Sequence, residues 1–204
     1  MASITSVLTV GMNLILKKFS EDAITVFGIY FKLNSFVFMP IFGMNNGLVP
    51  ILSYNYGAVK YDRIKKAVKL AMACAIAYMI VGLIVFQIMP DKLLMIFSVN
   101  SSVMSIGVAA LKIISLSFLF AGVGIIGSTV FQAIGNPVHS LIMSVLRQLV
   151  IILPAAFLLS FLGNVDYVWW SYPIAEAVSF VLCLILLVKT LKTVSYTHLR
   201  AHET

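Results

Sequence analysis

Long apolar runs fill most of this chain, and short polar segments divide them. The runs cover residues 1–16, 23–56, 68–89, 105–134, 138–162 and 169–188. A helix needs about 20 mainly apolar residues to cross a bilayer, so five runs are long enough and the first is short. The pattern predicts an all-α membrane protein, a six-transmembrane-helix bundle whose first helix is truncated.

Proline and glycine interrupt several of these runs. Residues 23–56 would form a helix of about 50 Å, longer than the hydrocarbon core of about 30 Å, so this helix must tilt, bend or protrude. Pro40 and Pro50 lie inside it and supply points of bending, because proline removes a backbone donor. Residues 135–137, Gly-Asn-Pro, form a stop signal after the fourth run. Pro154 lies inside the fifth run.

Composition excludes a water-soluble domain. Apolar residues make up 61% of the chain, charged residues only 10%, and the mean hydropathy is +1.06. Soluble domains carry about 25% charged residues. The net charge of +7 does not indicate nucleic-acid binding, because the basic residues gather in a short loop between apolar runs. Cys74 and Cys183 lie inside apolar runs and imply no disulfide.

The distribution of Lys and Arg predicts the orientation. Basic residues near the ends of membrane helices are enriched on the cytoplasmic side. One side of the predicted bundle carries Lys60, Arg63, Lys65, Lys66, Lys69, Lys189 and Lys192; the other carries Lys17, Lys18 and Lys92. We therefore expect a multi-pass protein of the cell membrane with the turn after residue 56 and both termini in the cytoplasm.

The two ends of the chain differ from its middle. Residues 1–16 are short for a crossing, as if the start of a helix were missing. Residues 194–204, VSYTHLRAHET, match the conceptual translation of a transposon-end sequencing adapter. We interpret residues 1–193 as the natural lobe and 194–204 as a non-native, adapter-derived tail. A genuine polar tail is the alternative.

Three segments, in order and at matching spacing, resemble the MATE (multidrug and toxin extrusion) family. Residues 43–58, GMNNGLVPILSYNYGA, resemble the end of the family's eighth helix and the basic loop after it. Residues 131–137, FQAIGNP, resemble its link between the tenth and eleventh helices. Residues 144–148, SVLRQ, with Pro154, resemble its eleventh helix. The sequence pattern of these segments is similar to that of the MepA-like and DinF-like bacterial members, and the match spans roughly residues 1–193.

This resemblance implies a fold and a function. Members of the family have two six-helix lobes across a central cleft, and export cationic or aromatic drugs in exchange for Na⁺ or H⁺ by alternating access. The chain would be the C-terminal lobe, with membrane lipid, the missing N-terminal lobe and small-molecule drugs as partners. It would need no cofactor besides the coupling ion. NorM-like members carry a coupling acid in the tenth helix, whereas residues 105–134 contain no Asp or Glu.

Four charged residues lie inside the apolar runs: Lys32, Lys112, Arg147 and Glu176. Buried charges in a membrane are costly and mark functional sites by default. Counting from the run ends places Lys32, Lys112 and Glu176 at one level, about 10 Å deep. Either Glu176 pairs with Lys112 or Lys32, or each lysine extends outward to the lipid headgroups. Arg147 would bind backbone carbonyls at a helix break or face the cleft.

Uncharged polar residues give a second set of candidates, namely Asn34, Asn45, Asn46 and Gln132. Such side chains either bridge helices within lipid or line a wet cavity. We find no metal-ligand spacing, no nucleophile motif and no phosphate-binding loop, so we expect no enzyme. A lipid or lipid-linked oligosaccharide flippase lobe and a non-transporting membrane scaffold are the alternative functions.

Overall fold

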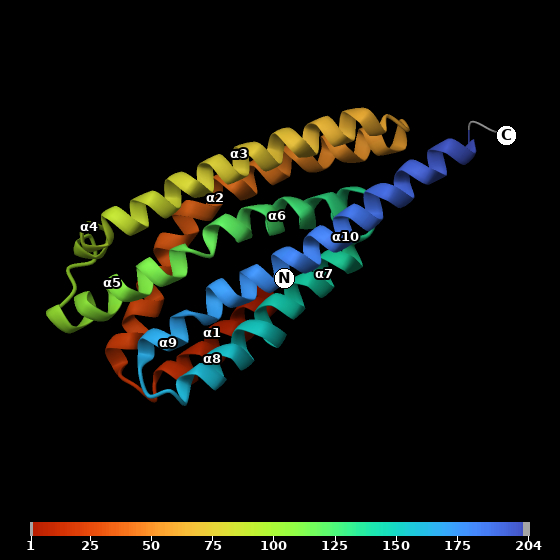
Figure 1. Ribbon diagram of the computed structural model, residues 1–204. Helices are drawn as coiled ribbons and strands as arrows, with labels where there is room; N and C mark the ends of the chain where they lie inside the picture. Colours follow the sequence, from red (N-terminus) through yellow and green to blue (C-terminus); the bar gives the residue numbers. More distant parts are fainter. Residues whose placement is uncertain (1, 202–204) are drawn as a thin grey trace.

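A computed structural model of the chain describes the backbone of residues 2–201 and the side chains of residues 4–189 (Figure 1). Every element in the described part is helical, which confirms the predicted fold class. The helices are α1 (Ala2–Leu16), α2 (Glu21–Gly57), α3 (Tyr61–Ile88), α4 (Pro90–Met95), α5 (Ser101–Ser115), α6 (Phe118–Ala133), α7 (Pro137–Val145), the π-helix η1 (Leu146–Ile152), α8 (Leu153–Ser160), α9 (Val165–Trp169) and α10 (Ser171–Ala201).

Capping residues set where several helices begin. The Ser20 hydroxyl accepts a hydrogen bond from the Ala23 amide at 3.1 Å, and Glu21 and Asp22 follow in the first turn of α2. Carboxylates in a first turn interact favourably with the positive end of the helix dipole. The Asn100 side chain caps α5 in the same way, accepting from the Val103 amide at 2.8 Å.

The structure refines the predicted crossings. Four helical stretches of the described chain are long and apolar enough to span a membrane, and α5 and α6 meet the same criterion only when taken together, with a bend of 49° between them. Residues 105–134, predicted as one span, thus form two helices with a break between Ser115 and Phe118. The shorter apolar helix, Ile4–Leu16, corresponds to the first run.

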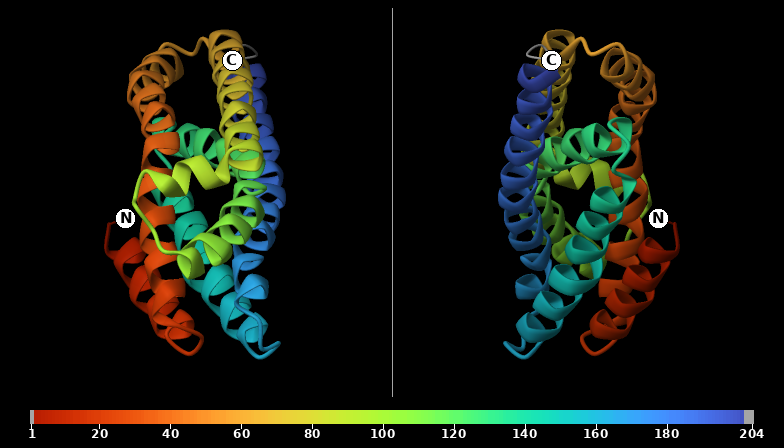
Figure 2. Two further views of the ribbon diagram at one scale, coloured as in Figure 1. Left: turned by 90° about the vertical axis from the view of Figure 1, so that its left-hand side faces the viewer. Right: turned by 90° about the vertical axis from the view of Figure 1, so that its right-hand side faces the viewer.

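Helix α6 lies at the centre of the bundle and packs against α2, α3, α7 and α10 (Figures 1 and 2). Its glycines permit this close approach, since small residues allow helix backbones to come together in membranes. A Cβ atom added at Gly127 would overlap the sulfur of the buried Cys183 on α10. Large apolar side chains such as Phe36, Val81 and Leu158 are exposed on the outside of the bundle. This exposure fits a surface solvated by lipid.

The connections gather at two opposite ends (Figure 1). The α2–α3 turn, the α6–α7 turn and the end of α10 lie at one end, and the α1–α2 and α8–α9 turns lie at the other. Gly135 has a φ of 84° in the α6–α7 turn, a conformation that glycine adopts without strain. The arrangement has the predicted up-and-down order, while the side facing the cytoplasm stays a prediction.

The proposed boundary at residue 193 lies within α10, whose backbone continues as helix to Ala201. The adapter-derived tail, residues 194–204, falls outside the part of the chain whose side chains are described. Its non-native origin therefore stays a prediction.

Candidate functional site: a polar cavity inside the bundle

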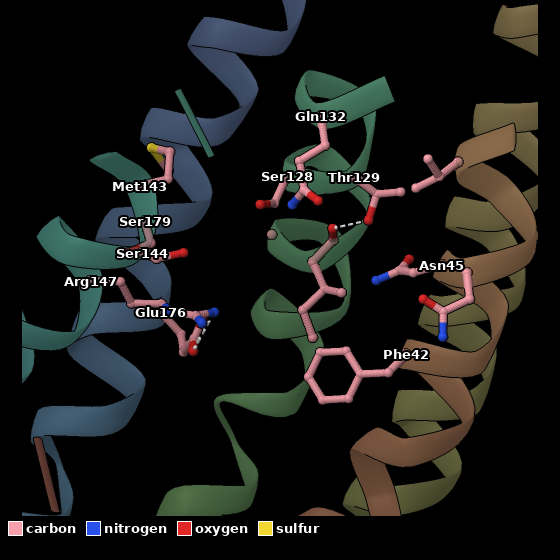
Figure 3. Close-up of a pocket in the computed structure, with 14 residues that line it drawn as sticks. Phe42, Asn45, Ser128, Thr129, Gln132, Met143, Ser144, Arg147, Glu176 and Ser179 are labelled. Carbon is pink, nitrogen blue, oxygen red and sulfur yellow. Dashed lines mark hydrogen bonds and ion pairs between the residues drawn. The ribbon is translucent and has the colours of Figure 1, made fainter. Parts of the chain in front are cut away.

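A cavity of about 250 Å³ lies between α2 on one side and α7, η1 and α10 on the other, with α6 behind it (Figure 3). The residues that line it are Phe42, Asn45, Asn46, Val49, Gly124, Ile125, Ser128, Thr129, Gln132, Met143, Ser144, Arg147, Glu176 and Ser179. Nine of these fourteen side chains are polar or charged. Polar side chains are rare in an apolar bundle and require hydrogen-bond partners or a ligand there.

An ion pair forms one wall of the cavity. The Arg147 guanidinium on η1 lies 3.3 Å from the Glu176 carboxylate on α10, measured from Nη1 to Oε1 (Figure 3). The two side chains are 24% and 12% exposed. The pair joins two neighbouring helices, and each charge offsets the desolvation of the other.

The prediction that Glu176 pairs with Lys112 or Lys32 is therefore wrong. Both lysine side chains are exposed on the outside of the bundle. The Lys32 ammonium lies 5.8 Å from the centre of the Phe97 ring. The backbone oxygen of Lys112 accepts a hydrogen bond from Gln87. Neither lysine lines the cavity that Glu176 faces.

A local change in helix geometry accompanies Arg147. Residues Leu146–Ile152 form a π-helix, and Pro154 follows in the first turn of α8. Proline supplies no backbone donor and crowds the preceding turn, so a wider turn before it relieves the conflict. The Thr5 hydroxyl donates to the Gln148 side chain at 3.3 Å and ties α1 to this segment. Arg147 thus lies in an irregular helical segment, and its partner is the Glu176 carboxylate, whereas backbone carbonyls were one of its predicted partners.

The polar side chains that α6 contributes to the cavity form hydrogen bonds with neighbouring residues. Gln132 donates to the hydroxyl of the fully buried Ser140 at 2.8 Å, and Ser128 shares a hydrogen bond with the same hydroxyl. The Thr129 hydroxyl donates to the Ile125 carbonyl at 2.9 Å within α6. The two bonds to Ser140 link α6 to α7.

Two polar atoms of the cavity have no partner among the residues that the structure describes. They are the side-chain oxygen of Asn45 on α2 and the hydroxyl of Ser179 on α10. Ser179 is 5% exposed and lies one helical turn after Glu176. A buried polar atom without a partner is costly, so each of these atoms has the capacity to bind water or a ligand.

The structure gathers five of the eight candidate residues at this cavity: Asn45, Asn46, Gln132, Arg147 and Glu176. The other three, Lys32, Asn34 and Lys112, lie elsewhere. Ser179 was not among the predicted site residues, although its spacing of three residues from Glu176 places it on the same helix face. Whether these residues act in transport stays a prediction.

Solved structures with the same fold are transporters. The chain superposes on an outward-facing multidrug resistance MATE family transporter of the MOP superfamily with a TM-score of 0.89 and 18% identity, covering 95% of this chain and 44% of that one. A MATE structure in the straight conformation gives a TM-score of 0.90 at 17% identity, covering 96% and 44%. At this identity the likeness shows the fold, which is that of one lobe of a membrane transporter.

Sequence comparison identifies the family. Residues 1–158 match MatE, and the chain belongs to this family. The multidrug export protein MepA of Staphylococcus saprophyticus is 29% identical over 167 residues, 82% of this chain and 37% of its own length. MepA of Staphylococcus haemolyticus is 30% identical, with 82% and 36% covered. The chain thus spans little more than a third of these relatives. The predicted family is confirmed, and it is a family of transporters, not of enzymes.

Proposed function

We propose that this chain is one lobe of a secondary active multidrug exporter, which moves cationic or aromatic compounds out of the cell in exchange for Na⁺ or H⁺. A second six-helix lobe would complete the transport cleft, and alternating access would expose it to each side in turn. The observation that carries this proposal is the polar cavity with its Arg147–Glu176 ion pair inside an apolar bundle. The MepA relatives are multidrug export proteins, which supports drugs as the substrates; the cationic or aromatic character comes from the family resemblance.

The cavity argues against the two alternatives. A lobe that binds a lipid-linked pyrophosphate needs several cations, but Arg147 is the one basic residue among the described side chains that line the cavity. Glu176 also neutralises it. A passive scaffold gains nothing from a polar cavity, because burying such groups in a membrane protein is costly. The exporter therefore fits the geometry best.

The proposal is tested with the complete reading frame of the gene that encodes this chain. Cells without their own efflux pumps would express it, and ethidium accumulation would be followed while ionophores collapse the H⁺ or the Na⁺ gradient. We expect lower accumulation with the gene, restored by collapse of the coupling gradient. Accumulation equal to that of empty-vector cells, with the protein present in the membrane, would overturn the proposal.

A matched pair of variants assigns the activity to the cavity. Glu176→Gln removes a charge that lines the cavity, and Lys112→Gln removes one on the outside of the bundle. We expect Glu176→Gln to reduce ethidium export at equal membrane abundance and Lys112→Gln to leave it unchanged. Equal export by both variants would remove the cavity from the proposal.

We also propose that the protein resides in the cell membrane with the α2–α3 turn in the cytoplasm, because this end carries the excess of basic residues. A cysteine introduced at Lys65, in a chain whose Cys74 and Cys183 are replaced by alanine, tests this orientation. A membrane-impermeant maleimide should label it only after the cells are opened. Labelling of intact cells would reverse the assignment.

A further inference from the structure

The polar cavity carries one charge of each sign, and the two charges cancel. Arg147 and Glu176 alone are charged among the described side chains that line it. Their atoms Nη1 and Oε1 lie 3.3 Å apart. A ligand with a single charge is attracted by one member of the pair and repelled by the other from nearly the same distance. A ligand that carries both charges can instead match each member of the pair.

Both members of the pair have hydrogen-bonding capacity beyond their contact with each other. A guanidinium has five N–H donors and a carboxylate about four lone-pair positions. The ion pair joins one nitrogen of Arg147 to one oxygen of Glu176, and both side chains line the cavity and are partly exposed. A second carboxylate can therefore bind Arg147, and a second ammonium can bind Glu176, while the pair stays in place.

Ser179 gives an independent indication of a ligand beside Glu176 (Figure 3). Its side chain lines the cavity and is 5% exposed, and its hydroxyl has no hydrogen-bond partner among the residues that the structure describes. Residues three apart on a helix are neighbours, so this hydroxyl and the Glu176 carboxylate lie on one face of α10. A primary ammonium has three N–H donors and no acceptor, which suits these two neighbouring acceptors.

The size and the apolar lining of the cavity limit the rest of the ligand. The volume of about 250 Å³ lies just below the roughly 300–1,000 Å³ that is usual for small-molecule sites, which favours a ligand of amino-acid size. Phe42 on α2 belongs to the wall that faces the ion pair, and Met143 on α7 also lines the cavity (Figure 3). Aromatic rings pack favourably against both phenyl and thioether groups. An aromatic body therefore fits the ligand best.

We propose that the cavity binds a small aromatic zwitterion. Its carboxylate binds Arg147, its primary ammonium binds Glu176 and Ser179, and its ring lies against Phe42 and Met143. This ligand class goes beyond the drug export proposed above, because a zwitterion uses both charges of the pair whereas a cationic drug uses one.

Binding of tryptophan to the product of the complete reading frame, purified in detergent micelles, tests the site. Scintillation proximity would report bound tritiated L-tryptophan. The unlabelled competitors would be tryptophan itself, its methyl ester, which is a cation, and N-acetyltryptophan, which is an anion. Each derivative lacks one charge and keeps the ring. We expect both derivatives to compete at least about tenfold more weakly than tryptophan, since each loses a hydrogen bond between charged groups.

Arg147→Gln and Lys112→Gln form a matched pair, because each removes one positive charge, the first beside the cavity and the second on the outside of the bundle. Arg147→Gln should weaken the binding of tryptophan about tenfold. The methyl ester should bind this variant at least as tightly as the unchanged protein, because Glu176 then attracts a cation without opposition. Lys112→Gln should leave the binding of both compounds unchanged.

Ser179→Ala separates the ammonium contact from the carboxylate contact. This variant should weaken the binding of tryptophan and of its methyl ester about fivefold, because both compounds carry the ammonium. It should leave the binding of N-acetyltryptophan unchanged. Equal weakening of all three compounds would contradict the assignment of Ser179 to the ammonium.

Equal competition by tryptophan and its two derivatives would overturn the proposal, and this comparison needs no variant. An equal loss of tryptophan and methyl ester binding in Arg147→Gln would show that the pair only maintains the fold, and would overturn it too. Absence of tryptophan binding in a protein that exports ethidium would overturn the zwitterion site and leave drug export standing. A preference for tryptophan in a protein that exports no ethidium would support the site and overturn the export.

Discussion

The ion pair between Arg147 and Glu176 is open to a quantitative test, because removing either partner leaves the other charge alone beside the cavity. At 3.3 Å, two unit charges attract each other by about 5 kcal/mol at an effective dielectric constant of about 20. Desolvation of both groups offsets most of this attraction. Stranding one member of a fully buried pair costs about 3–5 kcal/mol.

Because both side chains are partly exposed, we expect the cost of removing one partner to lie below that range. Arg147 keeps 24% of its side chain exposed and Glu176 keeps 12%, so water reaches both charges in part. We therefore expect Glu176→Gln to lower the free energy of unfolding by about 2–3 kcal/mol, somewhat less than for a fully buried pair. Arg147→Met should cost a similar amount. The double variant should be about as stable as either single variant.

The assay is a double-mutant cycle on the purified chain in detergent micelles, with unfolding followed by denaturant titration. The coupling energy between the two substitutions should be about 2 kcal/mol, as for contacting charged residues. Cycles that combine Glu176→Gln with Lys32→Gln or Lys112→Gln are the matched controls, and their coupling should lie within about 0.5 kcal/mol of zero. Additive losses for Arg147 and Glu176, or a clear coupling to either lysine, would refute the pairing described above.

Three further predictions concern the packing, capping and bending of the helices. Gly127→Ala places a methyl group against the sulfur of Cys183, so the free energy of unfolding should fall by about 1–3 kcal/mol. Adding Cys183→Ala should recover most of this loss, and denaturant titration of both variants checks it. Asn100→Ala removes the cap of α5 and should cost about 1 kcal/mol in the same titration, while an equal stability would deny the cap. Pro154→Ala restores a backbone donor after η1, so the π-helix should give way to α-helix and the coupling energy of the ion pair should fall; an unchanged coupling would show that proline does not maintain this geometry.

Much of the fold follows from the sequence because lipid imposes a simple rule. Each crossing must satisfy its own backbone hydrogen bonds, so an apolar run of sufficient length becomes a helix. The positions of α2, α3 and α10 follow from this rule alone. The break between α5 and α6 was not predictable in the same way, because Ser115, Leu116 and Ser117 carry no proline or glycine that marks a bend.

The candidate site was only partly predictable for a related reason. Counting residues gives the depth of a side chain, but the direction in which it points depends on the rotation of its helix, and packing decides that rotation. Residue counting predicts one level for Glu176 and Lys112, yet Glu176 pairs with Arg147 on η1, against which α10 packs. Arg147 is recognisable from the sequence as a charge inside an apolar run, but its partner is not. Long-range packing, which no local pattern contains, made the difference.

The π-helix η1 also has a consequence for how such a lobe can diversify. One residue corresponds to about 100° of rotation in an α-helix. A π-turn absorbs one extra residue by widening, so the segments on either side of it keep their faces. Deleting a single residue within Leu146–Ile152 would therefore let the segment close into regular α-helix while Met143 and Ser144 stay on the cavity wall. A single codon lost or gained here would thus change the backbone geometry that holds Arg147 and leave the rest of the lining in place.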